Sequence, residues 1–168
     1  MDWKDGNKFE AHVESKLGSF NTTIPGQAMT LYNVSDHWQE YASMISDIRT
    51  VCPLQSLAEF VSENFVADVY SYVATQKRSH LGGVADRTID VAAILGTFKG
   101  SNEGETKFAI NMQQMFSTFV KTGKLPMTKD VTLGMYIVDA EISTQRNYPK
   151  CDFWKQAQDI VPTYASLD

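Results

Sequence analysis

Val66 to Ala74 reads Val-Ala-Asp-Val-Tyr-Ser-Tyr-Val-Ala, and this stretch carries the clearest strand signal in the chain. Its β-branched and aromatic residues favour extended backbone. Downstream, Glu105 to Thr122 has an apolar residue every three or four positions and is followed by Gly123, which predicts a long amphipathic helix. Leu133 to Ile142 predicts a second strand. Two strands make a poor sheet by themselves, so either this is a small α+β domain with a poor core or the sheet partners lie on another segment.

The remaining periodic segments predict further helices around these strands. Ser35 and Asp36 can cap a helix that stops before Cys52-Pro53, because the following apolar residues have helical spacing. Shorter helices are expected at Phe9 to Leu17, Leu54 to Asn64, Ile89 to Leu95 and Cys151 to Val161. Loops are expected at Asn21 to Gly26 and at Gln76 to Arg87.

The composition is that of an ordinary globular chain. It has 168 residues with 15 Lys+Arg and 20 Asp+Glu, a formal net charge of −5, so we expect neither nucleic acid nor an anionic membrane surface as a partner. No apolar run approaches the roughly 18 residues that a membrane span needs. The amino end lacks the basic and apolar regions of a signal peptide.

No motif for a complete active site is present. We find no G-x-S-x-G nucleophile elbow, H-E-x-x-H zinc motif, phosphate-binding loop or calcium loop, so no metal or cofactor is predicted. His12 and His37 fall at positions typical of ordinary solvated residues. His80 lies in a glycine-containing loop and is the one histidine with a plausible functional setting.

Cysteines and glycosylation sequons point to the cell exterior. Cys52 and Cys151 are either two buried thiols or one long-range disulfide, and neither belongs to a metal-type pair. Two N-glycosylation sequons begin at Asn21 and Asn33. Together these features favour a secreted protein, in which a disulfide persists. Because no leader precedes them, we expect that the gene product begins upstream of Met1.

Five short motifs in a fixed order carry a family resemblance. They are Cys52-Pro53, Val-Tyr-Ser-Tyr-Val-Ala at 69–74, Gly-Val-Ala-Asp-Arg-Thr-Ile-Asp-Val-Ala-Ala-Ile-Leu-Gly at 83–96, Phe-Ser-Thr-Phe-Val-Lys-Thr-Gly-Lys-Leu-Pro at 116–126, and Cys-Asp-Phe-Trp at 151–154. In this order they resemble the C-terminal third of the carboxylesterase/cholinesterase family, over about Lys4 to Val161. The resemblance implies an α/β fold, with residues 1–168 forming the C-terminal part of one α/β-hydrolase domain. Such a segment would be mostly helical, with two strands that complete a sheet supplied by another segment. It also implies a Cys52–Cys151 disulfide.

The resemblance implies a catalytic triad that is broken. The nucleophilic serine and the oxyanion loop would lie upstream of this chain. Lys4 to Phe9 resembles the Met-Asp-Gly-His-x-Phe element of bile-salt-activated lipases, which places Asp5 at the triad acid. Arg87 stands at the position of the catalytic histidine, and a permanently protonated guanidinium cannot take a proton from serine. His80 is a weak alternative base, and we expect Asp5 and Arg87 to form an ion pair.

These expectations describe the C-terminal segment of a secreted, glycosylated homologue without catalytic activity. Such proteins use the fold as a scaffold for adhesion, partner binding or storage. The expected partner is the N-terminal part of the same domain, on a processed or separate chain, with other proteins possible in addition. The alternatives are a chain of an active carboxylester hydrolase whose serine lies on the missing part, and an independent small binding domain. An intact nucleophile elbow upstream would favour the enzyme.

Overall fold

The computed structural model describes residues 5–18, 21–33, 36–66, 68–78, 85, 88–125, 135–145, 148 and 150–157. The chain divides into two compact units. The first comprises Met1–Leu54 and Pro149–Asp168, and the second comprises Gln55–Tyr148. Each unit is described by itself.

The first unit is helical. It contains α1 (Gly6–Leu17), α2 (Ile24–Leu31), α3 (His37–Ser46), the π-helical turn η1 (Asp47–Val51) and α7 (Cys151–Gln156). The predicted cap of α3 is confirmed, because the Asp36 carboxylate accepts a hydrogen bond from the backbone N–H of Trp38 at 2.9 Å. The loop prediction for Asn21 to Gly26 is wrong, since α2 begins at Ile24. Pro25 fits its first turn, where the missing N–H has no partner to lose.

The predicted helix end before Cys52-Pro53 is also wrong. After α3 the chain makes the wider turn η1, in which the Cys52 N–H reaches the carbonyl of Asp47, five residues back. The chain then continues directly into α4 (Cys52–Asn64). A proline inside a regular helix clashes with the carbonyl four residues earlier, and the wider turn before Pro53 relieves that crowding.

The core of the first unit joins its helices through apolar and aromatic side chains. Trp154 from α7 is fully buried and donates its indole N–H to the Tyr32 hydroxyl at 2.8 Å. The Tyr32 hydroxyl in turn donates to the buried carboxylate of Asp47 at 2.7 Å. The other buried apolar residues of this unit are Phe9, Val13, Leu17, Ala28, Met44, Ile48, Val51, Cys52 and Cys151.

The second unit holds a three-stranded mixed sheet rather than the two strands expected. β1 (Ser71–Ala74) pairs in parallel with β2 (Met135–Val138), which pairs antiparallel with β3 (Ile142–Gln145). The predicted strand from Leu133 to Ile142 divides because residues 139–141 form a tight turn, in which the Asp139 N–H bonds the Glu141 carbonyl at 2.9 Å. The strand predicted from Val66 to Ala74 is longer than β1, which starts only at Ser71.

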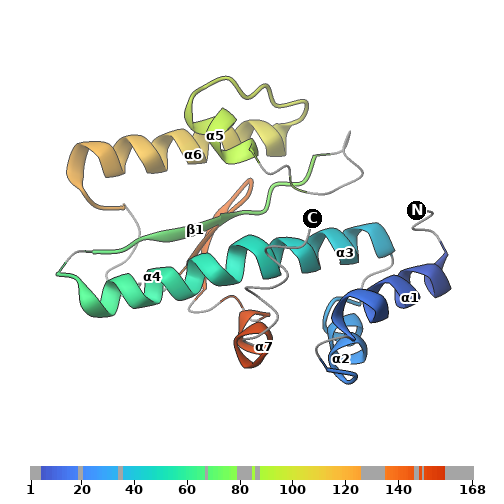
Figure 1. Cartoon of the computed structure of the whole chain (residues 1–168). Coiled ribbons are helices and arrows are strands. Elements are labelled where there is room, and N and C mark those ends of the chain that lie inside the picture. Colours follow the sequence, from blue (N-terminus) through green and yellow to red (C-terminus); the bar gives the residue numbers. More distant parts are fainter. Residues whose placement is uncertain are drawn as a thin grey trace. The chain divides into compact units, whose positions relative to one another are not determined.

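Two helices, α5 (Ile89–Ile94) and α6 (Glu103–Thr122), lie between the parallel strands in sequence and pack on the sheet (Figure 1). The predicted stop of α6 at Gly123 is confirmed, since its φ value is 68°, and Gly96 after α5 has a similar φ value of 72°. The residues that form this core are Ile89, Ala93, Phe108, Met112, Met115, Tyr136 and Val138. Hydrogen bonding reinforces the contact, because the Tyr72 hydroxyl donates to Asp90 at 2.8 Å.

Candidate functional site

Asp5, the predicted triad acid, lies at the N-cap of α1. Its carboxylate faces the Lys8 ammonium at 3.3 Å, and the two side chains are 39% and 60% exposed. The hydrogen bond from Lys8 lowers the pKa of Asp5 below its ordinary value. Arg87 and His80 lie outside the described residues, so the Asp5–Arg87 ion pair stays a prediction. Asp5 is therefore an ionised surface carboxylate with a local partner.

A histidine–carboxylate pair that the sequence interpretation missed lies in α3. Nδ1 of His37 is 2.6 Å from Oε2 of Glu40, whose side chain is only 6% exposed. The Phe9 ring of α1 stacks on the imidazole with centroids 4.9 Å apart and planes 16° from parallel. A Cβ placed on Gly6 would lie 3.1 Å from Nε2 of His37, a tight contact that the imidazole would have to relieve by shifting slightly. The imidazole therefore packs against the helix start that follows Asp5.

His12 makes a second polar contact between the same two helices. Its Nε2 lies 3.1 Å from the Tyr41 hydroxyl, and the two rings meet edge to face. Burial lowers the pKa of His12, and the charge of Lys16 acts in the same direction. His12 and His37 are half-exposed, so they are solvated in part, as expected, but each also has a specific side-chain partner. For His37, the sequence signal that could have predicted its contact is the spacing to Glu40, since residues three apart share a helix face.

The chemistry of this α1–α3 contact is limited to binding and holding protons. The imidazole of His37 is oriented by a buried carboxylate, as a general base would be, but none of its contacts with the described part of the chain is a serine or cysteine nucleophile. Within the described residues, no group of three or more His, Cys, Asp or Glu side chains could hold a metal ion. The observed arrangement is that of a packed interhelical contact.

The disulfide that the resemblance implies is present in the first unit. Cys52 and Cys151 are bonded across 99 positions of sequence, and both residues are buried. The bond ties α7 to the start of α4. Beside it, the Lys150 ammonium lies 4.0 Å from the centre of the Tyr32 ring, a distance typical of a cation–π contact.

The two predicted glycosylation asparagines are exposed. Asn21 precedes α2, and Asn33 directly follows the buried Tyr32 at the end of α2. Thr23, the hydroxyl residue of the first sequon, contacts the Asn21 side chain. Val34 and Ser35 of the second sequon lie outside the described residues.

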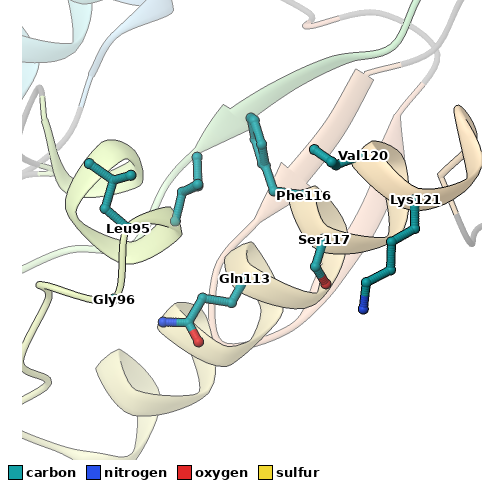
Figure 2. A pocket seen from close by; sticks show the side chains of 8 residues that line it. Leu95, Gly96, Gln113, Phe116, Ser117, Val120 and Lys121 are labelled. Carbon is teal, nitrogen blue, oxygen red and sulfur yellow. The ribbon is translucent and has the colours of Figure 1, made fainter.

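The second unit carries an open apolar groove between α5 and α6, with a volume of about 550 Å³. Figure 2 shows Leu95 on one side and the α6 side chains on the other. Gln113, one of the lining residues, donates to the Ala93 carbonyl at 3.0 Å. The residues that line the groove are Ile94, Leu95, Gly96, Gln113, Phe116, Ser117, Val120 and Lys121.

Comparison with known proteins gives one informative match. No protein-family model and no solved structure matches the chain. None of the described helices is long and apolar enough to span a bilayer. The chain is 31% identical to Neurotactin of Drosophila melanogaster over 159 residues, which is 94% of this chain. It spans only 18% of the length of that relative. This similarity supports the resemblance to carboxylesterase/cholinesterase-like proteins.

Proposed function

We propose that this chain is the C-terminal segment of an extracellular cholinesterase-like protein that acts as a non-catalytic scaffold in adhesion or partner binding. The observation that carries the proposal is the residue at the base position. The resemblance implies that Arg87 stands at the position of the catalytic histidine of the family, and arginine cannot act as the proton acceptor for a serine hydroxyl. The similarity to Neurotactin, a cholinesterase-like adhesion protein, supports the same conclusion.

The described contacts of Asp5 are local, because its carboxylate pairs with Lys8 from its own helix. The disulfide supports an oxidising, extracellular compartment, because such bonds are rare in the cytosol.

A scaffold role also requires surfaces that receive other chains, and the second unit has them. On α4, Leu57 and Phe60 are 54% and 57% exposed, although both are large apolar residues three positions apart on one face. On α6, Val120 is 79% exposed. We propose that the N-terminal part of the same domain covers such surfaces and adds strands beside β1, which is an end strand of the described sheet.

The proposal is tested with the intact protein, expressed with its upstream sequence and presented both in solution and on cells. We expect no hydrolysis of p-nitrophenyl acetate above that of a matched inactive protein. We also expect non-adherent cells that display the protein to aggregate with one another or with cells that carry a partner. Arg87→Lys serves as the control that keeps the charge. Rapid ester turnover that His80→Ala abolishes would establish the carboxylester hydrolase instead.

A further inference from the structure

The first sequon of the chain is closed into a local turn by its own hydroxyl residue. Oδ1 of Asn21 accepts two hydrogen bonds from Thr23, one from the backbone N–H and one from the side-chain hydroxyl, each 2.9 Å long. All three residues of this sequon are exposed. Among the described residues, no acceptor lies within hydrogen-bond distance of the Asn21 Nδ2 amide. The carbonyl side of the amide is therefore held by Thr23, in a residue that is exposed.

This geometry prepares the amide nitrogen for modification. Two donors on Oδ1 stabilise negative charge on that oxygen, which favours the amide resonance form that is easier to deprotonate at nitrogen. The β-branched Thr23 has a restricted χ1 angle, so its hydroxyl is held toward Oδ1. Both contacts are between residues two apart, and they need no tertiary structure to form. The turn can therefore exist before the rest of the chain has folded.

We infer that Asn21 is the principal N-glycosylation site of this chain and is modified more fully than Asn33. The inference rests on the proposed extracellular location, because the modification occurs in the secretory pathway. The donor is an oligosaccharide linked through pyrophosphate to a lipid. The Asn21 Nδ2 forms a bond to the anomeric carbon and loses one proton, while the bond from that carbon to the phosphate oxygen breaks and the lipid pyrophosphate leaves.

The surroundings of Asn33 are less favourable for the same reaction. Three residues later Asp36 is already committed to capping α3. The second sequon also ends in Ser35, which lacks the methyl group that restricts a threonine hydroxyl.

A glycan on Asn21 has a consequence for the scaffold role. A branched, hydrated sugar cannot be buried in a protein interface, so the connection between α1 and α2 must remain in solvent in the intact protein. Partner contacts would then be made by other surfaces, such as the exposed apolar residues of α4 and α6. Glycosylation at Asn21 thus keeps the α1–α2 connection in solvent and leaves partner contacts to other residues.

The experiment tests the preference for Asn21 separately from the question of where in the cell the protein resides. The full chain is translated behind a cleavable leader in the presence of microsomes, and the glycan is recognised by a mass step that peptide N-glycosidase removes. We expect Asn21→Gln to lose most of the modified species and Asn33→Gln to keep most of it. Thr23→Val, which keeps the shape but removes the hydroxyl, should lose the Asn21 glycan. Thr22→Val is the matched control and should retain it.

Two results would overturn the inference. One is equal or greater loss of the modified species with Asn33→Gln than with Asn21→Gln. The other is retention of the Asn21 glycan by Thr23→Val. Location is read separately on the intact protein in its own cells, by the conversion of a glycan-bearing asparagine to aspartate on enzymatic release. Suppose that Asn21 is preferred in microsomes but the native protein is found inside the cell. That result would contradict the proposed function, while the inference that Asn21 is the preferred acceptor would still hold.

Discussion

Nδ1 of His37 lies 2.6 Å from Oε2 of Glu40, one helical turn further along α3. The carboxylate is nearly inaccessible to water, with its side chain only 6% exposed, so it needs donors from the protein itself. The imidazole provides one of them and is in turn held by the stacked ring of Phe9. A side-chain contact within one helix thereby determines how α1 packs on α3.

We expect Glu40→Gln to destabilise the intact protein by about 1 kcal/mol, because a hydrogen bond to a buried charged group is exchanged for a weaker one to a neutral amide oxygen. The free energy of unfolding in denaturant measures the effect, and Glu10→Gln, at an exposed position of α1, is the control. Because Glu40 has further partners, the double variant with His37→Gln isolates the pair. If the two single effects simply added, the His37–Glu40 contact would contribute nothing.

The Tyr72–Asp90 hydrogen bond predicts a loss of stability at alkaline pH. Burial, and then the bond to Asp90, raise the pKa of Tyr72 well above its ordinary value of 10. A group whose pKa is higher in the folded state than in the unfolded state contributes stability that is complete below the unfolded value and is lost as pH rises above it. We therefore expect the free energy of unfolding to fall above about pH 10.

Tyr72→Phe should flatten that alkaline decline and also lower stability near neutral pH by about 1 kcal/mol, the usual loss for one hydrogen bond. Thermal melting of the intact protein between neutral and alkaline pH measures both effects. Tyr70→Phe, which removes a hydroxyl from the residue two positions earlier, is the matched control. An unchanged alkaline decline in Tyr72→Phe would show that another group causes it.

Local signals in the sequence predicted the elements that depend on local interactions. The stripe of α6 and its end at Gly123 follow from helical spacing and from the left-handed backbone that glycine adopts easily. The cap at Asp36 follows in the same way, from a short carboxylate before a helix. The Cys52–Cys151 pairing could be anticipated only through the family resemblance, because spacing alone left free thiols open.

The elements that the sequence did not reveal depend on context. A proline normally ends a helix, and nothing local indicates that a wider turn will let the chain continue through Pro53. The apolar run through β2 looks continuous, although the Asp139 side chain bonds the next backbone N–H and turns the chain toward β3. The packing of His12 and His37 requires α1 to be placed on α3, which no local pattern specifies.

The disulfide predicts that the stability of the fold depends strongly on the bond between Cys52 and Cys151. Cys52 and Cys151 close a loop of 99 residues, and cross-linking a loop of this size stabilises a fold by about 4–5 kcal/mol in the chain-entropy model. We expect peptide mapping without reduction to recover Cys52 and Cys151 in one linked pair. Cys52→Ser with Cys151→Ser should lower the secreted yield strongly. Recovery of both cysteines as free thiols from the native protein would contradict the structure and remove the main support for the family resemblance.

The exposed apolar side chains predict that this chain does not fold stably alone. Leu57, Phe60 and Val120 are each more than half exposed, which is costly unless another segment covers them. We expect the isolated 18.8 kDa chain to bind hydrophobic dyes and to melt without a sharp transition. Leu57→Ser with Phe60→Ser should reduce dye binding by the isolated chain, yet destabilise the intact protein, in which we propose that these residues are covered. A core change, Phe108→Ser, should instead destabilise both forms, because Phe108 is fully buried within the second unit. A cooperative, dye-free monomer would favour the independent binding domain, since such a chain needs no partner to complete its core.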